Sequence, residues 1–320
     1  MKIRIIYFFF FLFPVLANAQ PVPNIEENIP YLMTFGPLAE TSWGDDDFSQ
    51  TFFFLFPKDY EKPVFIWVFD PDVGGKVDEL ATAWDTRVSY SFYGGAGCWS
   101  DEDAQGTDPV GNYRSGNLLA TKSFGQNARY DNNWYVFGPF NPTEGEYVER
   151  YEGNVIKVII EGLEGDDGNM YRFFMSTSPS ERISIEGANA FAYEYSFRMH
   201  NVAEQVSHIY PFVDDQTISV RLSNFDWDSD GYIRLVSVAR KGQLSRVSTE
   251  DEWIETEFRM YEEEKNTSLD IQFIKRKPAI RNNNVVIYVK NQYGRNLEFF
   301  TSPIGGVPKY KYSIGVKQKN

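Results

Sequence analysis

Short apolar runs separated by polar, Gly-rich or Pro-rich stretches make up most of the chain. Three of these runs are TFFFLF (51–56), VFIWVF (64–69) and NVIKVII (154–160). They are rich in β-branched and aromatic residues, which favour buried strands. Residues 190–197 and 268–274 alternate apolar and polar positions, as strands with one solvated face do. The pattern therefore predicts a fold built mainly of short strands.

Helical periodicity is confined to two brief segments. VDELATAW (77–84) and TEDEWIETEF (249–258) each allow a helix of a few turns at most. The chain also contains 27 Phe and 20 Tyr, an aromatic excess that favours strands over helices. We therefore predict an all-β fold.

Two pairs of segments in the chain are similar to each other. An aromatic-Pro pair leads into a strand ending in FDPDVGG (69–75), and another leads into a strand ending in FDWDSDG (225–231). Residues 154–179 and 284–303 then share Asn-Val, an apolar strand, a Gly-containing turn, Phe-Phe and a closing Ser-Pro. The matches keep their order, which indicates a tandem duplication. We expect two tandem antiparallel β-sandwich domains, jelly-roll-like in topology.

The predicted organisation has four parts. Residues 1–19 form a signal peptide, because a basic start and an apolar stretch precede Ala-Asn-Ala. Residues 20–30 are Pro-rich and form an extended N-terminal segment. The first sandwich domain covers 31–198 and the second covers 199–320, each close to the usual domain size. The alternative for the N-terminus is a membrane anchor, but its apolar run is short for a span.

Charge and cysteine content limit the classes of partner. The formal net charge is −14, and loss of Lys2 and Arg4 with the signal peptide makes the mature chain more acidic still. Nucleic acids repel such a chain. A single cysteine, Cys98, allows no internal disulfide, and a buried structural thiol is the simpler interpretation of it. The sequence predicts an exported protein, periplasmic or extracellular, with no nucleic-acid partner and no membrane span after cleavage.

The loop DWDSDG is the strongest candidate metal site in the sequence. Asp226, Asp228 and Asp230 alternate before a glycine, as in the first half of a helix-flanked calcium loop, where the next carbonyl, here that of Tyr232, is also a ligand. The bidentate Glu that ends such a loop is missing, and the flanking segments are strands. Calcium takes about six to eight oxygens, so further ligands are needed, and the nearest candidates are Asp214 and Asp215. A solvated acidic turn without an ion is the alternative.

Two further loops in the first half carry candidate calcium ligands. Asp70 and Asp72 hold the positions that correspond to Asp226 and Asp228, although Pro71 and the glycines alone suffice for a turn. The stretch WGDDDF places Asp45, Asp46 and Asp47 in succession. Consecutive strand residues point to opposite faces, so these carboxylates share an ion only if they lie in an irregular loop.

The first acidic loop also carries a family resemblance. FDPDVGGKVDE followed by YSFYGGAGCWS resembles the acidic-loop β-sandwich modules of exported bacterial proteins, and is similar to the pre-peptidase C-terminal type of domain. The resemblance implies an accessory, non-catalytic module with cation-stabilised loops. This chain departs from the pattern in the long insertions of its first half and in having no accompanying catalytic domain.

The function predicted from these features is non-catalytic: binding, or interaction with a cell-envelope protein, with calcium as the only cofactor. Carbohydrate binding is the main alternative, because Trp43, Trp99 and Trp134 fall near loops or strand ends where aromatic rings stack on sugars, although buried tryptophans are common. A glycoside hydrolase with paired carboxylates is a further alternative. Two histidines, His200 and His208, give little support to a nucleophile–His site or a zinc site.

Overall fold

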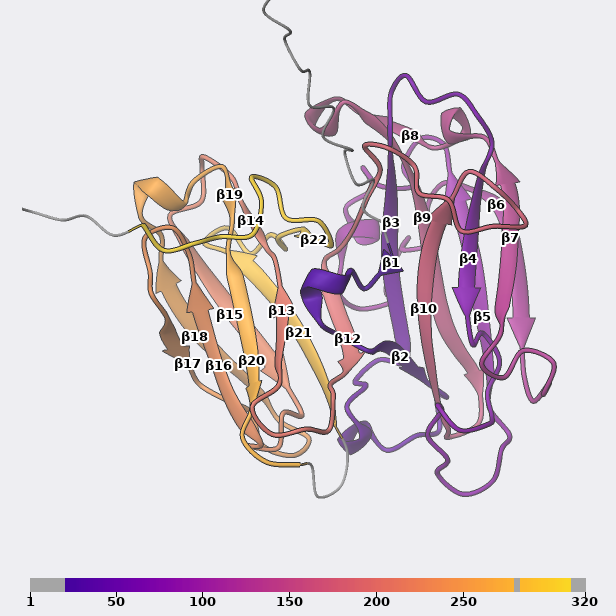
Figure 1. Cartoon of the computed structure of the whole chain (residues 1–320), viewed down its shortest axis with the longest axis horizontal. Helices are drawn as coiled ribbons and strands as arrows, with labels where there is room; N and C mark the ends of the chain where they lie inside the picture. The colour runs from indigo at the N-terminus through magenta and orange to yellow at the C-terminus, as the bar shows by residue number, and fades with distance from the viewer. Residues whose placement is uncertain (1–20, 279–282, 312–320) are drawn as a thin grey trace, which may run out of the picture.

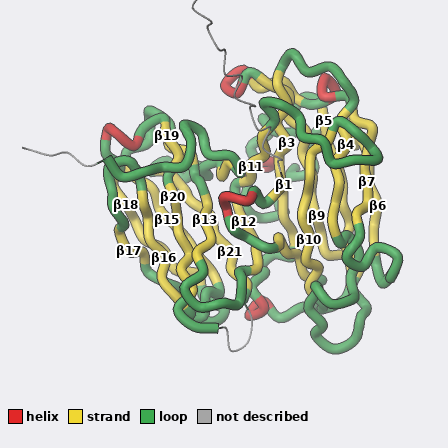
Figure 2. The backbone as a smooth tube through the Cα atoms, in the orientation of Figure 1, coloured by secondary structure: helices red, strands yellow, loops and turns green. Residues whose placement is uncertain are grey.

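A computed structural model describes residues 21–278 and 283–311. In this part of the chain the regular structure consists of strands and six 3-10 turns, and every strand pair is antiparallel, so the all-β prediction is confirmed (Figure 2). The predicted signal peptide lies outside the described residues. The 3-10 turns are η1 (Ile25–Glu27), η2 (Thr41–Trp43), η3 (Asp103–Gln105), η4 (Pro142–Glu144), η5 (Glu149–Tyr151) and η6 (Glu262–Glu264).

One large sheet runs through the whole molecule. In spatial order its strands are β18 (Trp253–Arg259), β15 (Ser219–Phe225), β21 (Asn284–Asn291), β12 (Glu194–Arg198), β2 (Tyr31–Phe35), β10 (Gly168–Ser176), β4 (Val64–Phe69) and β7 (Trp134–Phe140), with β1 (Pro21–Val22) also paired to β10. In Figure 1, β12 and β2 lie between a left-hand and a right-hand lobe.

Smaller sheets cover one half of this sheet each. In the right-hand lobe the covering sheet contains β22 (Phe299–Phe300), β11 (Asn189–Ala192), β3 (Ser49–Pro57), β9 (Gly153–Glu164), β5 (Arg87–Gly94), β6 (Asn117–Phe124) and β8 (Glu146–Val148). In the left-hand lobe it contains β13 (Val206–Ile209), β20 (Asp270–Lys275), β16 (Gly231–Val236) and β17 (Gln243–Ser245). A two-stranded sheet pairs β14 (Phe212–Val213) with β19 (Thr267–Ser268).

Aromatic side chains hold the layers together. The ring centroids of Phe52 in β3 and Phe173 in β10 lie 5.8 Å apart, and this contact joins the two sheets of the right-hand lobe. The ring centroids of Phe197 in β12 and Phe273 in β20 lie 5.4 Å apart, and this contact joins the two sheets of the left-hand lobe. These distances are typical of favourable ring pairs. The molecule is therefore two sandwiches that share one sheet.

The run TFFFLF is apolar on both faces of its strand for a physical reason. Successive strand residues point to opposite faces. Phe52 and Phe54 enter the core between the sheets, whereas Phe53 enters a second apolar cluster with Phe191 and Phe300 on the outer face. Because both faces of β3 are buried, its sequence shows no alternation.

The predicted domain boundary at 198/199 falls directly after a strand that joins the two lobes. Strand β12 pairs with β2 on one side and with β21 on the other. The strand pairing also differs between the two similar segments. By the sequence matches, β4 corresponds to β15 and β9 corresponds to β21. Strand β15 pairs with β21, whereas β4 pairs with β10, and β9 lies in the other sheet. The division into two domains stays a prediction.

Two other segments differ from expectation. Residues 249–258 do not form a helix, because most of them belong to β18, where Phe258 packs into the core. Residues 77–84 are irregular, with a single bridge between Glu79 and Gly168. In both segments, pairing with a neighbouring strand overrides a weak local preference for helix.

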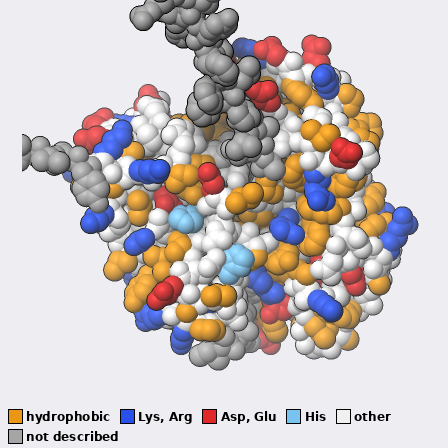
Figure 3. Space-filling model, viewed as in Figure 1, with side chains coloured by type: hydrophobic (Ala, Val, Ile, Leu, Met, Phe, Trp, Pro, Cys, Tyr) orange, Lys and Arg blue, Asp and Glu red, His pale blue; other side chains and the backbone are white. Residues whose placement is uncertain are grey.

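The predicted N-terminal extended segment packs onto the sandwich. Val22 and Ile29 are buried in the main core, and β1 extends the sheet at β10. On the face drawn in Figure 3, acidic and basic side chains are interspersed. Within residues 21–278 and 283–311, no helix has the length and apolarity needed to cross a bilayer.

Candidate metal centre

The second Asp loop joins β15 to β16 and is tightly wound. Asp226, Asp228 and Ser229 have φ values of 55°, 53° and 54°, in the left-handed region. The backbone N–H of Asp230 donates to the carbonyl of Trp227 at 3.0 Å, which closes the turn. Within the described residues, the carboxylates of Asp226, Asp228 and Asp230 do not form a group with oxygens within 4.8 Å of one another. The structure therefore does not gather these three residues into one ligand set.

A lysine lies where calcium was expected. Asp230 is 5% exposed and its Oδ2 lies 3.2 Å from Nζ of Lys275, whose side chain is fully buried. Lys277 lies 4.0 Å from the other oxygen of Asp230. Asp226 accepts a hydrogen bond from the backbone N–H of Asp251 at 2.9 Å. An ammonium group therefore relieves the repulsion at Asp230, and a backbone donor relieves it at Asp226.

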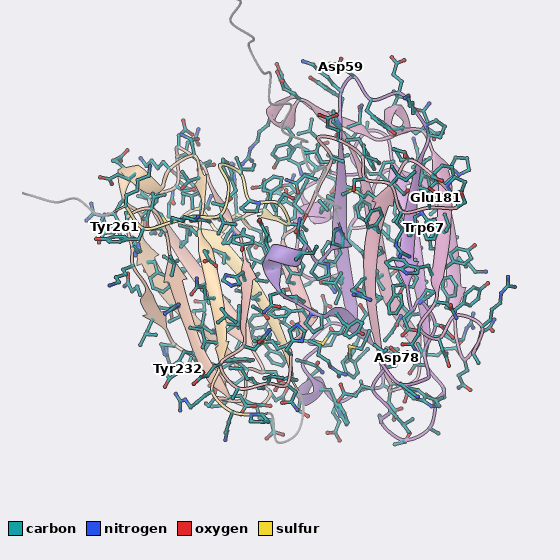
Figure 4. All side chains as sticks on the ribbon, in the orientation of Figure 1. Asp59, Trp67, Asp78, Glu181, Tyr232 and Tyr261 are labelled. Carbon is teal, nitrogen blue, oxygen red and sulfur yellow. The ribbon has the colours of Figure 1, made fainter. Side chains whose placement is uncertain are left out.

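The other predicted ligands of this loop are dispersed. Tyr232 has an exposed ring, labelled in Figure 4, with the Arg276 guanidinium 4.3 Å from its centroid. Asp214 accepts from the Thr217 hydroxyl at 2.6 Å and braces a turn, and Asp215 is exposed. Among the described residues, neither Asp214 nor Asp215 belongs to a group of clustered carboxylates.

The first Asp loop does form a cluster. Asp70 and Asp72 follow β4, and Asp131 precedes its neighbour β7, so pairing of the two strands brings the three together. One carboxylate oxygen of each lies within 4.8 Å of the others. We call Asp70, Asp72 and Asp131 the Asp70 cluster. It lies in the same part of the molecule as Asp78, labelled at the lower end of the right-hand lobe in Figure 4.

Two oxygens of the Asp70 cluster are buried without a partner. Asp70 and Asp72 are 1% and 0% exposed. One oxygen of Asp70 accepts from the N–H of Asn132 at 2.9 Å, and one of Asp72 accepts from Asn127 at 3.2 Å. Oδ2 of Asp70 and Oδ1 of Asp72 accept no hydrogen bond from the described residues. Buried polar atoms without partners are costly, so this site calls for a proton or a cation.

Burial and like charge act together on the protonation of this cluster. Burial, and after it the neighbouring Asp131, raise the pKa of Asp72 to about 7. Burial raises the pKa of Asp70 to about 6. Asp78 accepts from the N–H groups of Gly74 and Met170 at 2.8 and 2.7 Å, and burial followed by Asp70 holds its pKa well above the usual range. Arg172 acts against the shift at Asp70, but burial outweighs it, so these carboxylates hold protons more tightly than exposed ones do.

A second cluster lies where the two sheets of the right-hand lobe meet. Asp45, Asp46 and Asp47 have oxygens within 4.8 Å of one another. Asp45 is 1% exposed and accepts from the N–H groups of Phe35 and Phe48 at 2.7 and 3.0 Å, which fixes the irregular loop before β3. Oδ1 of Asp46 and Oδ2 of Asp47 are buried without a hydrogen-bond partner.

Two carboxylates from distant segments face these aspartates. Glu194 opens β12, is 7% exposed and pairs through its backbone with Tyr288 of β21. Burial holds its pKa well above the usual range, and Asp46, Asp47, Asp45 and Asp108 add to the effect. We call these five residues the Asp45 cluster. In the described part of the chain, no Lys, Arg or His nitrogen lies within 4.0 Å of their carboxylates.

A third acidic group was not foreseen. Asp85, Asp166 and Asp167 also have oxygens within 4.8 Å of one another. Asp167 accepts from the N–H groups of Ala81 and Asp85 at 3.1 and 2.9 Å, and Asp85 is exposed. Backbone donors satisfy Asp167 and the Thr82 hydroxyl donates to Asp166, so these two aspartates brace the turn between β9 and β10.

The tryptophans predicted to bind sugars are half-buried. Trp43 packs 6.2 Å from Phe35. Trp134 packs edge-on to Phe69 at 5.2 Å, with the Arg182 guanidinium 4.5 Å from its ring. Trp99 donates from Nε1 to the Tyr193 hydroxyl at 3.0 Å. None of the chain's tryptophans is among the exposed large side chains of the described residues.

No protein-family model matches the chain, and no curated protein matches it. The functional proposal therefore rests on the site itself. Sequence reasoning found Asp45, Asp47, Asp70 and Asp72 but missed Asp131 and Glu194. A single acid between two tyrosines in an apolar strand, as in AYEYS, is the sequence signal that could have identified Glu194.

Proposed function

We propose that the protein is an exported, non-catalytic binding or cell-envelope interaction protein whose loops are held by calcium. The Asp45 cluster carries the proposal. Three of its carboxylates have oxygens within 4.8 Å of one another, and Glu194 and Asp108 line one small cavity and interact electrostatically with them. Two of the aspartate oxygens are buried without partners, and no basic nitrogen of the described residues lies within 4.0 Å. An ion at this point would tie the loop before β3 to β12 of the large sheet.

The donor atoms favour calcium over zinc. Both clusters offer only carboxylate oxygens among the residues described, and calcium takes about six to eight oxygen ligands whereas zinc prefers nitrogen and sulfur. The cavity beside the Asp45 cluster, lined by Asp108 and Glu194, has a volume of about 20 Å³. A water molecule needs roughly 10–15 Å³, so this space suits an ion or a water and is far too small for a substrate.

The test is calcium binding by the mature protein after treatment with a chelator. Saturating calcium is expected to raise the melting temperature, since a ligand at 100 times its Kd adds about 2.7 kcal/mol. Glu194→Gln together with Asp47→Asn should remove most of the gain. Asp59→Asn, at the opposite end of the molecule in Figure 4, is the matched control. Identical melting curves in chelator and in calcium would rule the proposal out.

A second candidate function is supported by one cavity. A space of about 210 Å³ lies between the lobes and is lined by Trp99, Arg150, Tyr293, Asn296 and Glu298, among others. Oδ1 of Asn296 is buried there without a partner. An aromatic wall beside amide and guanidinium groups suits a sugar ring. A glycan array would test it: binding that is lost in Asn296→Ala would support carbohydrate recognition, and an array without binding would reject it.

A further inference from the structure

Three buried polar side chains meet between the two sheets of the left-hand lobe. Lys275 is the last residue of β20, Asp230 directly precedes β16, and Asn283 directly precedes β21 of the large sheet. They are 1%, 5% and 8% exposed. Tyr232, labelled at the lower left in Figure 4, follows Asp230 by two residues and marks this end of the lobe.

The contacts place an amine against an amide carbonyl. Nζ of Lys275 donates to Oδ2 of Asp230 at 3.2 Å and also to Oδ1 of Asn283. The amide nitrogen of Asn283 donates to the carbonyl of Met199, while the backbone carbonyl of Asn283 accepts from the N–H of Met199 at 2.8 Å. Met199 thus holds Asn283 with its side-chain carbonyl toward the lysine.

The surroundings exclude water from this contact. Nζ of Lys275 lies 5.2 Å from the centroid of Trp227, which is 1% exposed and packs edge-on to Phe273 at 5.7 Å. Burial lowers the pKa of Lys275, so the neutral amine is more accessible than in water. Groups fixed within reach of each other in a dry site react far faster than free groups do.

We propose that Lys275 and Asn283 form an intramolecular isopeptide bond, with Asp230 as the proton-transfer group. Nothing in the proposed calcium function requires this bond. It would join the two sheets of the left-hand lobe covalently at one end.

The reaction balances without a cofactor or an oxidant. Asp230 takes a proton from the Lys275 ammonium, and the neutral amine attacks Cγ of Asn283 to form a C–N bond. A proton then passes from the attacking nitrogen to Nδ2, the Cγ–Nδ2 bond breaks, and ammonia leaves. Ammonia carries the proton held by Asp230 away as ammonium when it reaches water. The products are an amide and ammonium, and the Asp230 carboxylate then has Lys277, 4.0 Å away, as its remaining basic neighbour.

The test is a tryptic digest of the denatured mature protein analysed by mass spectrometry. The sequence predicts that the peptide 282–290 is joined to 266–276, with the pair lighter by one ammonia than the two free peptides. Intact mass alone does not decide, because cyclisation of an N-terminal Gln20 also releases ammonia. Recovery of 266–275 and 282–290 as separate linear peptides in full yield would overturn the proposal.

Variants separate the roles of the three residues. Lys275→Arg keeps the charge and should abolish the linked peptide. Asp230→Asn should slow linkage by about a hundredfold, the usual size of a general acid–base contribution. Lys277→Arg, on a half-exposed side chain, is the control and should link fully. Equal linkage in Asp230→Asn would remove Asp230 from the mechanism, and the wild-type digest decides the bond even if a variant fails to fold.

Discussion

The two Asp loops, residues 70–75 and 226–231, follow strands of the same sheet and begin with the same Phe-Asp-x-Asp pattern, yet their carboxylates meet different partners. In the first loop a third aspartate, Asp131, arrives from β7, and two carboxylate oxygens stay buried without a donor. In the second loop Lys275 arrives from β20 and contacts Asp230 at 3.2 Å.

The comparison shows that the neighbouring strand determines which charged group lies beside the carboxylates of an acidic loop. Local spacing brings carboxylates near one another, but neutralisation depends on a residue far away in sequence. An acid from the neighbouring strand leaves a site that needs an added cation. A lysine from the neighbouring strand supplies the cation within the chain. Changes to the internal cation, to the bound protons and to the loop backbone each test this contrast.

Removal of the internal cation should be the most damaging change. In chains where the proposed bond to Asn283 has not formed, Lys275→Met leaves Asp230 buried without its ammonium partner, and loss of one member of a buried pair costs about 3–5 kcal/mol. In linked chains the same change removes the cross-link, so stability falls in both cases. Urea unfolding would measure the loss. Lys277→Met, whose side chain is 54% exposed, is the control and should change stability by less than about 0.5 kcal/mol. A Lys275→Met variant as stable as the wild type would contradict the role given to this lysine.

The metal-free protein should lose stability as pH rises. Burial raises the pKa of Asp45 and Asp72 to about 7 and that of Asp46 to about 6, so these groups bind protons more tightly in the folded chain than in the unfolded one. Their stabilisation is full below the unfolded pKa near 4 and is lost as pH rises through about 6 to 7.

Unfolding in chelator at about pH 5 and about pH 8 is expected to differ by a few kcal/mol, with the lower pH more stable. Calcium should flatten the profile, because the ion replaces the protons at the higher pH. A chelated protein that is more stable at the higher pH would show that burial of these carboxylates has the opposite effect.

Removal of one charge from the Asp70 cluster should change stability in opposite directions without and with calcium. Asp131→Asn relieves repulsion of Asp70 and Asp72, so in chelator it should raise the free energy of unfolding by about 1 kcal/mol. In calcium the same variant should be less stable than the wild type, since a ligand is lost. Paired unfolding experiments in chelator and in calcium measure both values. The same direction in both conditions would mean that the Asp70 cluster does not bind the ion.

The strands and the acidic ligands differ in how far the sequence predicted them. The aromatic runs predicted β3, β4 and β9, because strand period and burial are local properties. The weak helical pattern of residues 249–258 was misleading, because most of these residues pair with β15 as a strand and Phe258 is buried in the core. Asp131 and Lys275 were not predicted for the same reason. Asp131 comes close to the first loop because β7 pairs with β4, and Lys275 comes close to the second because β20 pairs with β16.

Backbone strain offers the smallest and most local comparison. The first loop has Gly74 and Gly75 at positive φ, whereas the second places Ser229 at φ 54°. A side chain in the left-handed region costs about 1–2 kcal/mol, and the greater freedom of unfolded glycine offsets part of it. Ser229→Gly should therefore stabilise the protein by about 0.5 kcal/mol in chelator and in calcium alike.

The reverse change, Gly75→Ala, should destabilise by about 1–2 kcal/mol. Its φ is 80°, and an added Cβ would lie 3.0 Å from Cγ of Asp131. Because that contact pushes on the Asp70 cluster, Gly75→Ala should also reduce the calcium response, which Ser229→Gly leaves unchanged. Melting curves of both variants with and without calcium separate strain from ligand displacement. An unchanged calcium response in Gly75→Ala would indicate that Asp131 can move without loss of the ion.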